Sequence, residues 1–107
     1  MEKLYTRKNL EVIANGDDSF VKLMLETFYS SCRKAMEEVK EALVSEDFET
    51  IGKIAHKIKP SVDTVAPALS ESVRKVEAIP DNNDVELVQL FVESLSATLD
   101  QLQTDLG

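Results

Sequence analysis

A single histidine and a lysine three residues after it are the residues of this chain whose types and spacing suggest chemistry. They lie in the stretch Ile54-Ala55-His56-Lys57-Ile58-Lys59-Pro60-Ser61. Neutral imidazole is available near neutral pH and can act as a nucleophile that carries a transferred group. An ammonium group one helical turn away can stabilise a phosphoryl or carboxylate group held there. The sequence therefore points to His56 and Lys59 as a candidate group-transfer site.

Other chemistries are poorly supported by the residues available. One His, one Cys and Asp63 cannot complete a metal site of four ligands. Ser61 falls about 280° around the helical wheel from Ile51 and His56 about 140°, so the two do not form a nucleophilic pair. Three scattered glycines provide no Gly-rich phosphate loop. Cys32 lies inside an apolar stripe, which predicts a core thiol. We expect no metal and no cofactor on this chain.

The composition limits the class of protein and its partners. A chain of 107 residues fits one domain, spanning 1–107, and its net charge of −8 argues against nucleic acid or an anionic membrane as the main partner. A single Cys forms no internal disulfide, and the N-terminus lacks the apolar run of a signal peptide. Because no run of about 18 apolar residues occurs, we expect no membrane insertion and a cytoplasmic location.

Apolar residues at steps of three and four predict five helices. A short one covers residues 6–14, with Thr6 as N-cap and Asn15-Gly16 as its end. The others cover residues 18–44, residues 48–65, a shorter segment after Ala66-Pro67, and a last helix whose start is a capping-box variant of Asn83 and Glu86. The prediction is an all-α fold: an up-and-down antiparallel four-helix bundle with a short additional N-terminal helix.

The apolar stripes of the four longer helices define the predicted core. They consist of Val21, Leu25, Phe28, Cys32, Ala35, Val39 and Ala42; then Phe48, Ile51, Ala55, Ile58, Val62 and Val65; then Leu69, Val73 and Val76; and finally Val88, Phe91, Val92, Leu95, Leu99, Leu102 and Leu106. Each stripe is amphipathic, so each helix should bury one face against the others.

The wheel directs His56 away from the core, on the strip shared by Gly52, Lys59 and Asp63. Glycine costs about 1 kcal/mol inside a helix, so Gly52 on a solvent face suggests clearance for an approaching partner. Pro60 costs about 3 kcal/mol inside a helix and predicts a local bend. The predicted partner-binding residues are Gly52, Lys53, Lys57, Pro60 and Asp63.

This stretch resembles the histidine-containing phosphotransfer (HPt) domains of multistep two-component phosphorelays. That family carries a His-x-x-Lys core, commonly His-x-Leu-Lys-Gly-Ser, on the second long helix of a four-helix bundle. The corresponding residues here are His56-Lys57-Ile58-Lys59-Pro60-Ser61. The similarity continues in Asp18-Ser19-Phe20-Val21, in Glu26-Thr27-Phe28, and in Leu69 with Val76-Glu77.

The resemblance implies a phosphocarrier without turnover of its own. His56 would accept a phosphoryl group at Nε2 from the aspartyl phosphate of a receiver domain and pass it to another receiver, with Lys59 near the phosphate. The implied partners are response-regulator receiver domains and a hybrid sensor histidine kinase, and Mg²⁺ would be bound by the receiver. We expect the chain itself to be a monomer.

Two positions depart from the family pattern, because Pro60 and Ala66 stand where its members usually have glycine. They keep open an alternative function, a helical adaptor that binds a receiver or kinase domain without accepting phosphate. A plain bundle that dimerises through Leu23, Leu87 and Leu90 is the third possibility.

Overall fold

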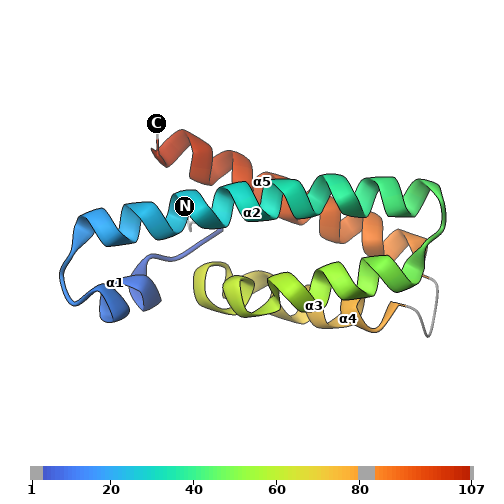
Figure 1. Ribbon diagram of the computed structural model, residues 1–107, viewed down its shortest axis with the longest axis horizontal. Helices are drawn as coiled ribbons and strands as arrows, with labels where there is room; N and C mark the ends of the chain where they lie inside the picture. Colours follow the sequence, from blue (N-terminus) through green and yellow to red (C-terminus); the bar gives the residue numbers. More distant parts are fainter. Residues whose placement is uncertain (1–3, 80–83, 107) are drawn as a thin grey trace.

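The computed structural model describes residues 4–79 and 84–106, in which the only regular elements are helices. They are α1 (Lys8–Ala14), α2 (Asp18–Val44), α3 (Phe48–Val65), the 3₁₀ turn η1 (Pro67–Leu69), α4 (Ser70–Glu77) and α5 (Val85–Leu106). Helices α2 to α5 run alternately up and down and pack as a bundle, with α1 at one end (Figure 1). The predicted all-α bundle with a short N-terminal helix is confirmed.

Aspartate side chains start the long helices. The Asp17 carboxylate accepts a hydrogen bond from the backbone N–H of Phe20, and the Asp47 carboxylate accepts one from Thr50. Such caps satisfy donors that the first helical turn leaves free. At the start of α5 the Asp84 carboxylate accepts a hydrogen bond from the backbone N–H of Leu87 at 3.1 Å. The predicted cap Asn83 lies outside the described residues.

The first helix begins later than its predicted start at Thr6. Arg7 is its N-cap residue and makes no side-chain cap bond. The Thr6 hydroxyl nevertheless accepts a hydrogen bond from the backbone N–H of Lys8 at 3.1 Å. The backbone N–H of Thr6 donates to the Val65 carbonyl at 2.7 Å, which holds this residue against the end of α3. The end of the helix is as predicted, because Asn15 (φ 52°) and Gly16 (φ 91°) both adopt left-handed backbone angles.

The predicted stripes form one core. Every predicted residue of α2 and α4 is buried, as is the η1 residue Leu69, while Phe48, Val92 and Leu106 are partly buried at the edge. Cys32 has no exposed surface, and its burial raises the pKa of the thiol to about 12, so the predicted core thiol is confirmed. None of the described helices is long and apolar enough to cross a membrane.

The segment before α1 lies along the last turns of α5. The backbone N–H of Leu4 donates to Gln101 Oε1 at 2.6 Å, and the Tyr5 hydroxyl donates to Asp105 at 2.6 Å. Tyr5 is itself buried, at 7% exposure. These contacts join residues about a hundred positions apart in the chain and fix the two ends of the described structure side by side.

Candidate functional site

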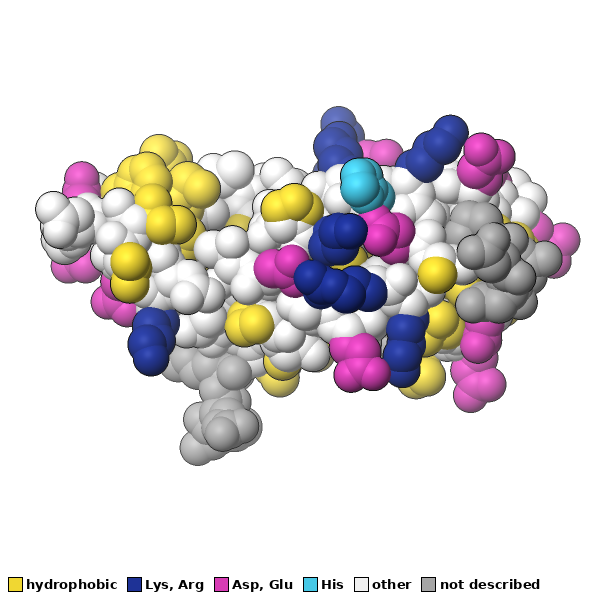
Figure 2. All heavy atoms as spheres, turned by 90° about the horizontal axis from the view of Figure 1, so that it is seen from below, with side chains coloured by type: hydrophobic (Ala, Val, Ile, Leu, Met, Phe, Trp, Pro, Cys, Tyr) yellow, Lys and Arg dark blue, Asp and Glu magenta, His cyan; other side chains and the backbone are white. Residues whose placement is uncertain are grey.

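Helix α3 carries His56 on the face opposite its core residues. Ile51 and Ala55 are fully buried, whereas 73% of the histidine side chain is exposed. In Figure 2 the histidine protrudes among Lys and Arg side chains, with an acidic group beside it. The outward direction predicted from the helical wheel is therefore confirmed, and the imidazole is accessible to another protein.

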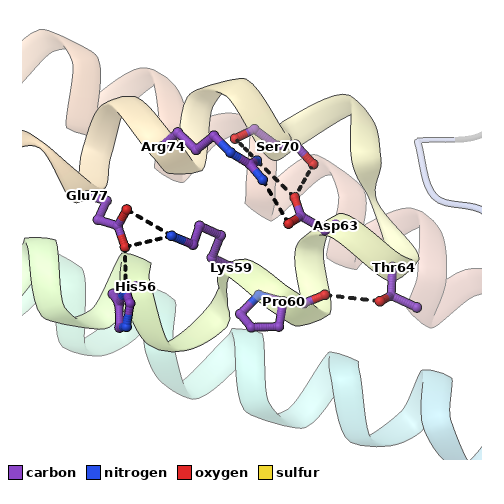
Figure 3. Close-up of polar contacts among 8 residues, drawn as sticks. All are labelled: His56, Lys59, Pro60, Asp63, Thr64, Ser70, Arg74 and Glu77. Carbon is purple, nitrogen blue, oxygen red and sulfur yellow. Dashed lines mark hydrogen bonds and ion pairs between the residues drawn. The ribbon is translucent and has the colours of Figure 1, made fainter.

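Glu77, from α4, lies between His56 and Lys59 (Figure 3). Its carboxylate contacts His56 Nδ1 and accepts hydrogen bonds from Lys59 Nζ at 3.0 and 3.1 Å. The hydrogen bond from Lys59, and after it that from His56, lowers the pKa of Glu77. The carboxylate is thus ionised near neutral pH and can only accept, so the Nδ1 atom of His56 carries the proton. The lone pair of the neutral ring then lies on Nε2, at the edge that points away from Glu77.

His56, Lys59 and Glu77 line an open hollow of about 530 Å³. Its lining residues are Glu49, Gly52, Lys53, His56, Lys59 and Glu77. Gly52 lines this hollow on the side of α3 that the wheel predicted. It is nevertheless buried, because the wheel shows only the direction within α3 and not what neighbouring elements cover. Lys53 forms an ion pair with Glu49 at 3.7 Å on the rim. Gly52, Lys53 and Lys59 thus lie beside the histidine.

Lys57 and Pro60 lie on two adjoining hollows. Lys57 faces α2, where it lines a hollow with Lys34. Pro60 lines another hollow with Ile13 of α1 and residues of α2. The helix continues through Pro60 to Val65. The predicted contact residues Gly52, Lys53, Lys57 and Pro60 therefore lie on three separate concavities and do not form one pocket.

Asp63 is engaged in a clamp between α3 and α4. Arg74 donates to both carboxylate oxygens of Asp63 at 2.9 Å, and the Ser70 hydroxyl donates to one of them at 2.6 Å. Asp63 does not line the hollow around His56. Arg74 and Glu77 are three residues apart on one face of α4, so this clamp helps to hold Glu77 against His56.

We expect the clamp to make folding stability depend on pH. The hydrogen bond from Arg74, and after it that from Ser70, lowers the pKa of Asp63. A carboxyl group whose pKa is lower folded than unfolded stabilises the fold above the unfolded value of about 4, and this stabilisation is lost as the pH falls through the folded pKa. Between pH 6 and pH 3 the melting temperature of the wild-type protein should therefore fall more steeply than that of Asp63→Asn, as measured by circular dichroism.

Glu93→Gln is the control for this comparison, because Glu93 is an exposed residue of α5 with no ion pair among the described residues. Its melting temperature should follow the wild-type curve. If Asp63→Asn also runs parallel to the wild type at every pH, the clamp contributes nothing to the acid sensitivity.

Glu77 is the site residue that the sequence did not assign. It entered the resemblance only as part of the pair Val76-Glu77. One signal was available: Glu77 is four residues after the core position Val73, at the edge of the buried face of α4. That position brings an acidic group toward a neighbouring helix, but it does not identify which helix.

Comparison with protein families relates the chain to a known class of domain. The model of the Hpt domain family matches residues 23–105, which include α3, α4 and most of α2 and α5. Comparisons with curated proteins and with solved structures gave no significant match. Hpt domains take part in phosphotransfer in two-component phosphorelays. Because the match covers most of the chain, including the helix with the exposed histidine, the chain belongs to the Hpt domain family.

Proposed function

We propose that this protein is a phosphocarrier whose phosphorylated residue is His56. The observation that carries the proposal is the ring's arrangement: Nδ1 is held by Glu77, and the opposite edge is exposed. A nucleophile that must reach a phosphoryl group buried in another protein needs both an available lone pair and access. The Nε2 edge of His56 meets both requirements.

The proposed transfer needs no reactant besides His56 and the phosphorylated receiver. The Nε2 lone pair of His56 attacks the phosphorus of a receiver's aspartyl phosphate, and the bond from phosphorus to the aspartyl oxygen breaks. The receiver recovers its carboxylate, and the ring becomes a positively charged phosphoimidazolium that keeps its proton on Nδ1. The Glu77 carboxylate stabilises this charge. Transfer to the aspartate of a second receiver reverses the step.

Lys59 contributes positive charge beside the transferred group. Its ammonium group is held by Glu77 within the hollow, and 27% of its side chain is exposed. A phosphoryl group on Nε2 would offer oxygens to the same ammonium. The Mg²⁺ that phosphoryl transfer needs would be bound by the receiver, as would most of the groups that stabilise the transition state.

The proposed partners are receiver domains, among them the receiver of a hybrid sensor histidine kinase. The concavity lined by His56 and the two others along α3 give such a domain a surface on α3 with contributions from α1, α2 and α4. Exchange of a phosphoryl group requires each complex to dissociate, so a modest and transient interface is expected.

The test is to mix the protein with a receiver domain phosphorylated with ³²P. A phosphocarrier takes up label that is lost in acid and retained in base, as expected for phosphohistidine. Binding of the receiver without label would support the adaptor alternative and overturn the proposal.

Removal of Glu77 should slow transfer by changing the tautomer of the ring. In Glu77→Ala the Nδ1 proton loses its acceptor, and the rate of transfer to His56 should fall about tenfold, the effect of the roughly 1.5 kcal/mol that a hydrogen bond to a charged group contributes. The ¹⁵N shifts of the imidazole nitrogens report the tautomer directly and should change with the rate. Glu77→Gln keeps an acceptor oxygen and should retain the wild-type tautomer. If Glu77→Ala leaves the ¹⁵N shifts and the rate unchanged, Glu77 has no positioning role.

A further inference from the structure

A hollow between α2 and α3 is lined by two lysines, one of which follows His56 in the chain. Its volume is about 350 Å³. Lys34 lies on the α2 side and Lys57, the residue after His56, on the α3 side. Both side chains are exposed. The base of the hollow consists of the buried residues Cys32, Ala35, Ile54 and Ile58.

These two lysines differ from the cations around them. Lys59, Lys53 and Arg74 each form an ion pair with a carboxylate. Over residues 4–79 and 84–106, neither Lys34 nor Lys57 has a carboxylate within 4.0 Å or a side-chain hydrogen bond. Their positive charge is therefore available to a partner, above a concave apolar base that strengthens its field.

The hollow also contains neutral donors and one opposing charge. Ser31 and Ser61 line it and can donate hydrogen bonds to an anion. Glu38 lines it as well, one turn after Lys34, and weakens the positive potential without an ion pair to either lysine. The arrangement fits a carboxylate side chain, which can accept from the ammonium and hydroxyl groups together.

We propose that this two-lysine hollow, formed by Lys34 and Lys57 with Ser31 and Ser61, binds an Asp or Glu side chain of the receiver domain that docks over His56. This inference rests on the proposed function. The chain carries a net charge of −8, so most of its surface repels an acidic partner. A localised unpaired positive site beside the histidine therefore favours encounters in which the acidic group of the receiver approaches with the correct orientation.

Charge-reversal variants test the proposal against a matched control. Lys34→Glu/Lys57→Glu is compared with Lys8→Glu/Lys22→Glu, which gives the same change in net charge at exposed lysines without an ion pair among the described residues. Lys22 is on α2 like Lys34, but twelve positions earlier, about 18 Å along the helix. The probe is the receiver domain that phosphorylates the wild-type protein, and its Kd for each variant is measured by fluorescence anisotropy at 0.05 M and about 0.5 M salt, where screening is strong.

We expect Lys34→Glu/Lys57→Glu to raise the Kd about tenfold at low salt and about twofold at high salt, and the control pair to raise it less than about twofold at either. Glu38→Gln should have the opposite effect and lower the Kd about twofold, because it removes the repulsive charge. Lys34→Arg/Lys57→Arg keeps both charges and should bind like the wild type.

The inference would be overturned if both charge-reversal pairs raised the Kd equally, or if high salt did not reduce the rise in Kd. If the wild-type protein takes label from the receiver but both pairs raise the Kd equally, the inference is refuted and the proposed function stands. A wild-type protein that takes no label refutes the proposed function and the inference with it.

Discussion

His56→Gln should take up no detectable ³²P from a phosphorylated receiver while keeping the helical bundle intact. The reason is that glutamine has no ring nitrogen to form the phosphoramidate, and His56 is the only histidine of the chain. The folding cost should be small, because 73% of the side chain is exposed and exposed substitutions usually change stability by less than about 0.5 kcal/mol. Label is measured by gel autoradiography, and folding by circular dichroism.

Lys40→Gln is a matched control on α2, where Lys40 forms an exposed ion pair with Glu37. It should take up label at the wild-type level. Label that persists on His56→Gln would place the phosphorylated residue elsewhere. A variant that unfolds would contradict the exposed position of the histidine.

Phe91→Ala should have the reverse effect of His56→Gln: it should weaken the fold and leave the site unchanged. Phe91 is 2% exposed in α5 and fills the centre of the core. Replacing a buried phenylalanine with alanine typically costs about 3–5 kcal/mol, a large part of the roughly 5–15 kcal/mol that stabilises a small domain. The free energy of unfolding is measured by urea denaturation.

The neighbouring residue provides the control, because Leu90 is 54% exposed. Leu90→Ala should change the free energy of unfolding by no more than about 0.5 kcal/mol. At low temperature, the folded fraction of Phe91→Ala should accept phosphate at the wild-type rate. A cost below about 1 kcal/mol would show that the core around Phe91 is not packed as described.

The sequence predicted the helices and most of the core because the apolar spacing depends only on the geometry of a single helix. The bounds 18–44 and 48–65 are those of α2 and α3. Interactions between helices were not predictable in this way. Glu77 reaches His56 only because α4 packs against α3, and Gly52 is buried although the wheel directs it outward. Ile13 fits the apolar pattern of α1 but is 64% exposed, since a seven-residue helix buries little of its surface.

The two departures from the family pattern are both compatible with the fold. Ala66 has φ −133°, a backbone angle that any residue adopts, so the position does not require glycine. Its N–H also completes the last turn of α3 through a hydrogen bond to the Val62 carbonyl at 2.8 Å. Pro60 is exposed, and α3 remains helical on both sides of it. Neither substitution removes a group that contacts His56.

The contacts of Leu4 and Tyr5 with the last turns of α5 have a topological consequence. The described chain is nearly closed into a loop, because the segment before α1 lies against the last turns of α5. Such a fold suits circular permutation, in which a short peptide joins the two ends and new termini are cut in an exposed turn. The turn between α2 and α3, where Glu46 is exposed, is a suitable place for the cut. In such a permuted chain α3 and α4 should still pack together and bring Glu77 against His56.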